Sequence, residues 1–345
     1  MLQNSELRQD PVSGDWILIS TARGQRPHDF AVEKPIEKTS AKTCPFEHPE
    51  RAGAGPLVAS YPKNDAAKDN WLVKIINNKY PAVTHTHTKG KIKCKECAAV
   101  KLFKIGPYSA INGVGHHEVV ITKDHNKDIW DLSHNEAKTL FKALADRYKA
   151  FIKEDGSISY VSMFHNIGPL AGASVYHPHY QIITLPVIPP DVGHSLAGSG
   201  RYKKRTGKCV HCYMIKWEKE QGSRIIFENE FAISFAPFVS RLPFETRVYP
   251  KRHNPYFEDT PANQIDDIIT ATQETVRKLH NALKPQYNLF IHTAPIKDKH
   301  KHEHYHWHIE ILPKISKIAG FELGTGIDIN IMDPDDAAKF IREAR

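Results

Sequence analysis

The residues best suited to chemistry lie in the segment His177-Pro178-His179-Tyr180-Gln181, which runs directly into the apolar residues 182–186. A β-strand points alternate side chains to the same face, so the imidazoles of His177 and His179 and the amide of Gln181 should form one row. Such a row predicts a phosphoryl-transfer site. Taken alone, the motif also suits a pair of solvated or metal-bound histidines that do no chemistry.

The rest of the chain favours chemistry because it contains two copies of one unit. Each copy has a cysteine near its start, then a single histidine, then an H-x-H pair. The single histidine precedes the pair by 52 residues in the first copy and by 53 in the second. We therefore predict two tandem units, residues 1–190 with the catalytic site and residues 191–345 with a metal site. The repeated residues are Cys44, His125, His177 and His179 in the first copy and Cys209, Cys212, His253, His306 and His308 in the second.

Each unit should carry an amphipathic helix between its single histidine and its H-x-H pair. Ser133 and Glu136 form a capping-box pattern for the first helix, and Thr260-Pro261, a cap followed by an N1 proline, begins the second. A last helix should begin at Asp333-Pro334. Residues 188–208 are rich in Pro, Gly and basic side chains, and we predict that they connect the two halves. Residues 84–104 should form an inserted loop.

Strand patterns flank both expected helices. Strands followed by a helix and further strands predict an α+β fold with a mainly antiparallel sheet and flanking helices. The predicted strands are 15–20, 71–76, 118–122, 160–164, 180–185, 224–227, 232–236, 246–249, 289–292 and 308–312.

The second unit contains a complete set of zinc ligands. Zinc takes four thiolate, imidazole or carboxylate ligands in a tetrahedron, and a C-x2-C turn supplies two of them from one tight loop. Cys209 and Cys212 form such a pair, and His253 and His306 complete the set. We expect a structural zinc site here.

The first unit lacks the second cysteine of that turn. The corresponding segment is Cys44-Pro45-Phe46-Glu47-His48, so Glu47 or His48 is the replacement ligand beside His125 and His177. The sequence leaves open whether this second site holds a metal.

Composition limits the alternatives. With 345 residues, 40% hydrophobic and 25% charged, the chain is an ordinary globular protein, and a start without an apolar signal indicates the cytoplasm. No membrane partner is expected, since about 18 consecutive apolar residues occur nowhere. The net charge of +8 does not favour nucleic acid, because the basic runs lack interleaved aromatic residues, and small phosphorylated substrates explain its sign. Five cysteines, an odd number, indicate metal ligands rather than disulfides; the role of the pair Cys94 and Cys97 stays open.

Several further segments, in order along the chain, carry a family resemblance. From about Glu6 to Arg342 the sequence resembles the galactose-1-phosphate uridylyltransferase family, a duplicated branch of the histidine-triad superfamily. The segments are 8–20, Arg23-Gly24-Gln25-Arg26-Pro27, Cys44-Pro45-Phe46, Asn78-Lys79-Tyr80-Pro81, Asn166-Ile167-Gly168, Ser174 with the H-P-H-x-Q motif, Leu242-Pro243-Phe244-Glu245-Thr246 and 319–326.

The resemblance implies a double displacement. His179 would attack the α-phosphorus of UDP-glucose, form a uridylyl-histidine and release glucose 1-phosphate, after which galactose 1-phosphate would take the nucleotide. An imidazole is nucleophilic near neutral pH without a further base, and Gln181 can donate a hydrogen bond to a phosphoryl oxygen. His177 would bind zinc, and its carbonyl would fix the tautomer of His179.

The resemblance also implies binding residues and a partner. A homodimer with composite active sites is expected, in which a C-terminal segment of one subunit reaches the sugar bound to the other. The implied substrate-binding residues are Arg23, Arg26, Asn78, Asn166, Ser174, Lys317, Phe321 and Glu322.

The second H-x-H pair is degenerate, since Glu310 stands where the first copy has Gln181. A carboxylate would repel a phosphoryl group, so only the first copy should turn over. In some relatives iron replaces zinc and binds both histidines of this pair, which would add His308, although Cys209 and Cys212 favour zinc.

Two other functions remain open at this level. On the same scaffold, an ADP-glucose phosphorylase or dinucleoside-polyphosphate phosphorylase prefers adenine and uses orthophosphate as acceptor. The second of these functions is that of a zinc-stabilised nucleotide-binding protein without turnover, although the intact His179 and Gln181 argue against it. The sequence settles neither the base nor the acceptor.

Overall fold

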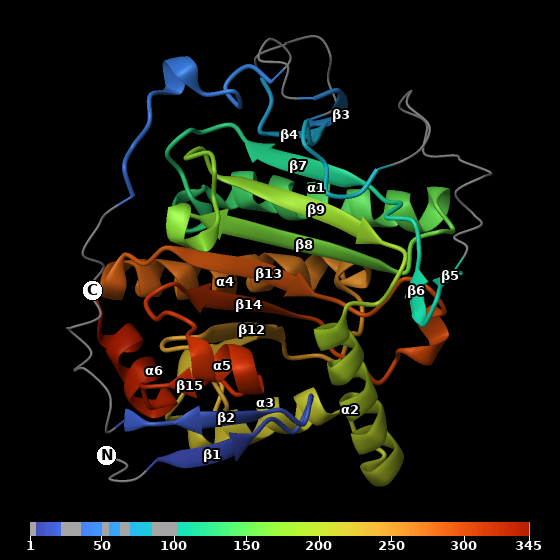
Figure 1. The fold of residues 1–345 in the computed structure, drawn as a ribbon. Helices are drawn as coiled ribbons and strands as arrows, with labels where there is room; N and C mark the ends of the chain where they lie inside the picture. The colour runs from blue at the N-terminus through green and yellow to red at the C-terminus, as the bar shows by residue number, and fades with distance from the viewer. Residues whose placement is uncertain (1–4, 22–35, 50–54, 63–69, 85–101, 345) are drawn as a thin grey trace.

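A ten-stranded antiparallel sheet forms the centre of the molecule (Figure 1). The computed structural model describes residues 5–21, 36–49, 55–62, 70–84 and 102–344, so Arg23, Arg26, Cys94, Cys97 and most of the expected inserted loop lie outside the described residues. The strands run in the order β10-β11-β12-β14-β13-β8-β9-β7-β4-β3. They are β3 (Leu57–Tyr61), β4 (Val73–Asn77), β7 (His117–Thr122), β8 (Tyr160–Ile167), β9 (His179–Leu185), β10 (Ile225–Glu228), β11 (Ala232–Phe235), β12 (Thr246–Pro250), β13 (Tyr287–His292) and β14 (His308–Pro313).

The two halves of this sheet have the same topology. In chain order the first half contributes β3, β4, β7, a helix, β8 and β9, and the second contributes β10, β11, β12, a helix, β13 and β14. Both halves place the last two strands in the same spatial order, and β8 pairs with β13 at the centre. The predicted α+β fold of two tandem histidine-triad-like units is confirmed, with one continuous sheet. The division at residue 190 stays a prediction.

Helices α1 (His134–Glu154) and α4 (Ala262–Leu283) lie side by side on one face of the sheet and cover the main hydrophobic core (Figure 1). The capping box of α1 is present, since Ser133 Oγ accepts from the Glu136 amide and Glu136 accepts from the Ser133 amide. The predicted cap of α4 is wrong by one residue. Pro261 itself is the N-cap, with extended backbone, and makes no side-chain capping hydrogen bond.

The predicted connection at 188–208 is helical. These residues form α2 (Pro190–Thr206), and α3 (Val210–Gln221) follows, so Cys209 and Cys212 lie in the first turn of a helix instead of a tight loop. The prolines begin α2, where a missing amide hydrogen costs nothing. Gly198 allows the helix to dock closely, because a Cβ there would lie 1.6 Å from the Val12 carbonyl oxygen. Glycine therefore marks a packing contact here.

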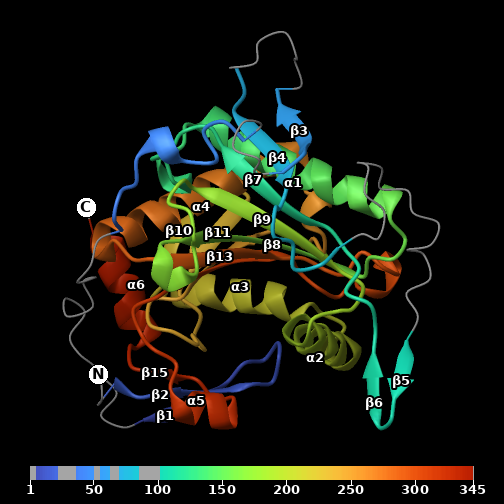
Figure 2. The same ribbon diagram turned by 45° about the horizontal axis from the view of Figure 1, so that its top comes forward.

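Smaller elements complete the structure beside the second half (Figure 2). A three-stranded sheet has the order β1-β2-β15, and α5 and α6 pack near it. The described helices include none that is long and apolar enough to cross a membrane. The bounds are β1 (Glu6–Gln9), β2 (Trp16–Ile19), β5 (Phe103–Ile105), β6 (Tyr108–Ala110), α5 (Gly320–Thr325), β15 (Ile329–Asn330) and α6 (Pro334–Glu343), with 3-10 turns at Ala41–Thr43, Ile129–Asp131, Pro169–Ala171, Phe257–Asp259 and Lys299–Lys301.

Candidate active site

His179, the first residue of β9, presents one unprotonated ring nitrogen. Its Nδ1 donates a hydrogen bond to the His177 carbonyl oxygen at 2.9 Å, the contact that the sequence predicts. Burial lowers the pKa of His179 to about 4, so the ring is neutral. With its proton on Nδ1, the ring carries a lone pair on Nε2. The edge of Phe46 packs against the ring, with centroids 5.0 Å apart, and limits its rotation.

Gln181 is oriented by a histidine of the neighbouring strand. His117 Nδ1 accepts from the Ala82 amide at 3.0 Å, which leaves its proton on Nε2. That Nε2 lies 2.9 Å from Gln181 Oε1, so the Gln181 amide hydrogens are directed to another acceptor. Asn78 Nδ2 lies 3.0 Å from the same ring nitrogen, but both atoms are donors in this tautomer, so the two groups are neighbours and not hydrogen-bonded partners. Two predicted site residues, Asn78 and Gln181, thus both lie beside His117.

Beside His179, the first half assembles four candidate metal ligands: Cys44, Glu47, His125 and His177, whose ligand atoms all lie within 4.8 Å of one another. Both histidines donate from Nε2 to backbone carbonyls, His177 to Thr122 and His125 to Thr39, so both Nδ1 atoms face the cluster. Glu47 Oε1 and His125 Nδ1 are buried without a hydrogen-bond partner, as expected for atoms that bind an ion. Of the two replacement ligands left open by the sequence, the cluster contains Glu47, whereas His48 is exposed.

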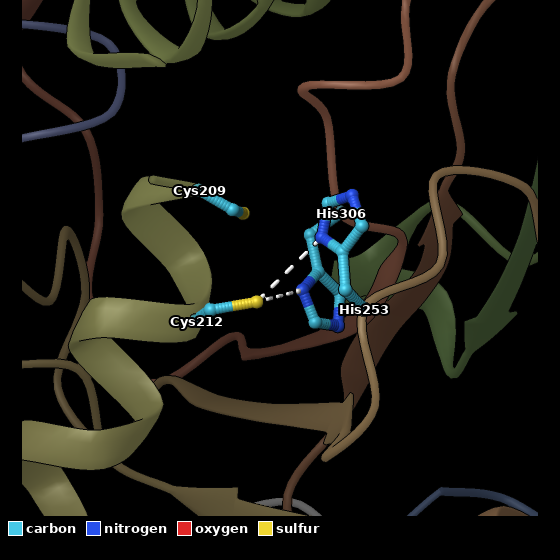
Figure 3. A group of neighbouring side chains, drawn as sticks. All are labelled: Cys209, Cys212, His253 and His306. Atoms are coloured by element: carbon cyan, nitrogen blue, oxygen red, sulfur yellow. Dashed lines mark hydrogen bonds between the residues drawn. The ribbon is translucent and has the colours of Figure 1, made fainter. Parts of the chain in front are cut away.

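The second half repeats this arrangement with Cys209, Cys212, His253 and His306 (Figure 3). Cys212 Sγ lies 3.6 Å from His253 Nδ1 and 3.5 Å from His306 Nδ1. Here too both Nε2 atoms donate to backbone carbonyls, those of Glu303 and Pro250. Figure 3 shows both cysteines on the first turn of α3, with their sulfur atoms turned toward the two rings.

The four groups of this cluster shift one another's pKa values. A hydrogen bond from Cys212 lowers the pKa of Cys209 well below its ordinary value, and the hydrogen bond to Cys209 raises the pKa of Cys212. A hydrogen bond to Cys209 also raises the pKa of His253. Two cysteines and two histidines with inward Nδ1 atoms form a set that can hold a metal ion once they give up their protons.

The second H-x-H pair divides its histidines between two clusters. His306 faces Cys212, whereas His308 lies beside Glu310, with 3.4 Å between His308 Nε2 and Glu310 Oε1. Arg247 and Arg241 lie 3.0 and 2.5 Å from the Glu310 carboxylate oxygens. Burial alone would raise the pKa of Glu310, but these two arginines lower it well below its ordinary value.

This arrangement bears on the iron alternative, in which both histidines of the pair bind the metal. A metal bound by both histidines of the pair would need His308 beside His306, but their ring nitrogens face different groups. The ligand atoms of His292, His308 and Glu310 do lie within 4.8 Å of one another, yet two guanidinium groups already neutralise the carboxylate. Within the described residues, His308, Glu310 and the two arginines form a buried ion-pair network.

The remaining predicted substrate-binding residues are dispersed in the monomer. Asn166 lies on β8 and accepts from Asn288 on β13 at 2.8 Å, and Ser174 is exposed in the turn before His177. Lys317 and Phe321 are exposed, and Glu322 caps α5 by accepting from the Ala319 amide at 3.0 Å. Figures 1 and 2 place α5 beside β2 and β15 and away from β9, so the monomer does not bring this segment to His179.

Sequence reasoning missed two residues that contact the motif, His117 and His165. His165 faces the core on β8, in alternation with the buried Val161 and Met163. A polar residue at a core position of a strand was the available signal. For His117 no such signal exists, because its contact with Gln181 depends on the register between β7 and β9.

Comparisons with known proteins agree with this geometry. A family model described as "Domain of unknown function (DUF4921)" matches residues 46–343. An ADP-glucose phosphorylase of Arabidopsis thaliana is 33% identical over 99% of this chain and 93% of its own length. The crystal structure of an ADP-glucose phosphorylase from Arabidopsis thaliana with bound ADP-glucose has a TM-score of 0.81 and 30% identity, covering 99% of this chain and all of that one. A galactose-1-phosphate uridylyltransferase of Thermotoga maritima is 26% identical over 98% of each chain. The chain therefore belongs to the DUF4921 family and, more broadly, to the galactose-1-phosphate uridylyltransferase family of the histidine-triad superfamily.

Proposed function

We propose that the protein is an ADP-glucose phosphorylase that transfers AMP from ADP-glucose to orthophosphate through a covalent adenylyl-histidine. The observation that carries the proposal is the unprotonated Nε2 of His179 beside an oriented Gln181 amide. The substrate follows the relative that is 33% identical over 99% of the chain. ADP-glucose and orthophosphate thus replace UDP-glucose and galactose 1-phosphate, the substrates that the sequence motifs alone favoured.

The reaction needs no separate acid or base. In the first step His179 Nε2 forms a bond to the α-phosphorus of ADP-glucose, the bond from phosphorus to the bridging oxygen breaks, and glucose 1-phosphate leaves. This leaving group is a stable anion that requires no proton. In the second step an orthophosphate oxygen attacks the same phosphorus, the nitrogen–phosphorus bond breaks, and ADP leaves with His179 regenerated.

The residues around His179 have distinct proposed roles. Gln181 donates to a phosphoryl oxygen while charge develops on it. Asn78, Asn166 and Ser174 bind the nucleotide and its phosphates, and Arg23 and Arg26 contribute guanidinium groups to the phosphates.

The C-terminal segment has a proposed role in a dimer. Lys317, Phe321 and Glu322 reach the sugar bound to a partner subunit, which makes the active sites composite. The distance of α5 from β9 within the monomer supports this arrangement. We place the protein in the cytoplasm, as the cysteine usage indicates.

We infer that both four-ligand clusters hold zinc. The orphaned Glu47 Oε1 and His125 Nδ1 support an ion in the first half, and the two sulfur atoms support zinc in the second. A bound zinc ion would cross-link the segments that carry its ligands. In the first half, His177 links the cluster to the nucleophile. Its ring is fixed in the cluster, and its carbonyl oxygen fixes the tautomer of His179.

The proposal predicts which nucleotide sugar labels the enzyme. Purified protein is incubated with ADP-glucose or UDP-glucose, each labelled in the base, and the protein-bound label is mapped. We expect ADP-glucose to label His179, because the adenylyl-enzyme accumulates when no acceptor is present. Orthophosphate should discharge the label as ADP, and galactose 1-phosphate should not.

Each other outcome selects a different function. Labelling by UDP-glucose with discharge by galactose 1-phosphate would make the protein a uridylyltransferase, the second candidate, which the Thermotoga maritima relative supports. Absence of label with both donors would contradict both enzymes and leave the nucleotide-binding protein.

A substitution of His117 tests the orientation of Gln181. His117→Phe keeps a ring at this position but removes the hydrogen bond to Gln181 Oε1, so the amide can turn its oxygen toward the phosphate. We expect the single-turnover rate of adenylyl-enzyme formation to fall by about tenfold to a hundredfold. His134→Phe changes an exposed histidine and is the control. An unchanged rate in folded His117→Phe would show that Gln181 needs no such partner.

A further inference from the structure

The buried histidine behind the nucleophile has two hydrogen-bond partners. His165 is fully buried, and its ring stacks on Tyr180 with centroids 4.3 Å apart and an interplanar angle of 10°. Its Nδ1 lies 2.7 Å from the carbonyl oxygen of His179, and its Nε2 lies 3.0 Å from Asp128 Oδ1. A carbonyl oxygen only accepts, so Nδ1 carries a proton.

The second partner is the carboxylate of Asp128. Asp128 Oδ1 also accepts from the Ile129 amide at 2.6 Å, and Oδ2 accepts from the Tyr287 hydroxyl. Burial alone would raise the pKa of Asp128, but hydrogen bonds from His165, Tyr287 and the Ile129 amide lower it below its ordinary value. These contacts hold the carboxylate in place, and the carboxylate in turn holds the His165 ring.

We propose that His165 positions the nucleophile by donating a hydrogen bond from Nδ1 to the backbone carbonyl of His179. The inference rests on the proposed role of His179. Asp128, which lies 3.0 Å from the other ring nitrogen, fixes the ring so that Nδ1 faces the carbonyl. A hydrogen bond that is buried in this way is stronger than one exposed to water.

Three successive carbonyls of the motif are held in this way by side chains. The His177 carbonyl accepts from His179 Nδ1, the Pro178 carbonyl from Thr122 Oγ1 at 3.2 Å, and the His179 carbonyl from His165 Nδ1. The segment therefore has little freedom to shift, and Nε2 of His179 keeps one position. A reacting atom held in this way needs no reorganisation before attack.

The degenerate twin lacks two of these three contacts. Strand register makes Ile291 the counterpart of His165, since Ile291 pairs with Ile309 as His165 pairs with Tyr180. Pro250, which has no hydroxyl, occupies the position of Thr122 at the end of the matching strand. Only the contact from His308 Nδ1 to the His306 carbonyl is kept, at 3.1 Å. The supports are thus confined to the copy whose H-P-H-x-Q motif is intact.

Nuclear magnetic resonance of the full-length protein labelled with ¹⁵N-histidine tests the hydrogen bond directly. We expect Nδ1 of His165 to carry a proton, since its partner is the carbonyl oxygen of His179. An unprotonated Nδ1 of His165 in the native protein would overturn the proposal, and this arm uses no substrate.

Kinetics of His165→Gln test the positioning role. We expect the single-turnover rate of adenylyl-enzyme formation to fall by about tenfold to a hundredfold, with a much smaller change in KM for ADP-glucose. His134→Gln is the control. An unchanged rate in folded His165→Gln would refute positioning. If native protein forms no adduct, only the proposed function fails, and the spectrum still decides whether His165 donates to the His179 carbonyl.

Discussion

His179→Ala should lose adenylyl transfer by roughly four orders of magnitude or more, because the variant retains no atom that can form the covalent intermediate. The binding residues remain, so the affinity for ADP-glucose should change little. The measurement is the rate of glucose 1-phosphate release under single-turnover conditions, together with the amount of base-derived label on the protein. Both should fall to background in the same variant.

The second half supplies a matched control for this substitution. His308→Ala makes the same change in the degenerate H-x-H pair, where Arg241 and Arg247 hold Glu310 against the histidine. Label and turnover should persist in this variant. The unfolding transition of both variants, followed by circular dichroism, separates lost chemistry from lost structure. Residual labelling of His179→Ala at another residue would contradict the assignment of the nucleophile.

The alternation and helix patterns predicted most of the sheet and its two covering helices. All ten predicted strands correspond to strands in the structure, because short apolar runs rich in β-branched and aromatic residues mark the fully buried strands as well as the half-buried ones. The short edge strand β3 was missed, as was β1 with its single buried residue, Arg8. Such strands carry too little apolar pattern to be recognised without their neighbours.

Helix α2 shows how composition misleads when tertiary contacts decide. Its glycines and terminal prolines indicated a loop, yet the helix buries Val192 and Leu196 in a cluster with Tyr160 and Tyr256. Gly198 is required by the close approach to Val12. Packing against residues far away in the sequence thus overrode the local propensity.

Part of the candidate site could also be predicted from the sequence, and part depends on contacts that only the fold creates. Spacing in the repeat predicted which histidines gather in the two clusters of candidate ligands, because equivalent residues of a duplicated unit occupy equivalent positions. Whether Glu47 or His48 joins the first cluster depends on the path of one turn, which no pattern encodes. The contacts of His117 with Gln181 and of His165 with the His179 carbonyl depend on strand register. The proposed preference for adenine over uracil follows from similarity along the whole chain, since the motif residues occur in both classes.

The cluster in the second half should contribute a large part of the stability of that half. Its ligands join the first turn of α3 to the chain after β12 and before β14, so an ion there would cross-link three segments. With free zinc a thousandfold above its dissociation constant, binding stabilises the folded state by about 4 kcal/mol. Cys212→Ser removes the sulfur that lies within 3.6 Å of both histidine Nδ1 atoms, and serine is a poor zinc ligand.

We therefore expect Cys212→Ser to lose one equivalent of zinc per chain and to unfold roughly 10 °C below the native protein. Elemental analysis of the purified proteins measures the loss and distinguishes zinc from iron, and calorimetry measures the shift. His300→Gln, an exposed histidine in the loop before His306, should change neither quantity. Chelation of the native protein should reproduce the lower transition, whereas Cys212→Ser should respond to chelator only through the first cluster. Native protein without zinc, or equal metal content and equal transition temperature in Cys212→Ser, would show that the two thiols and two imidazoles do not hold an ion.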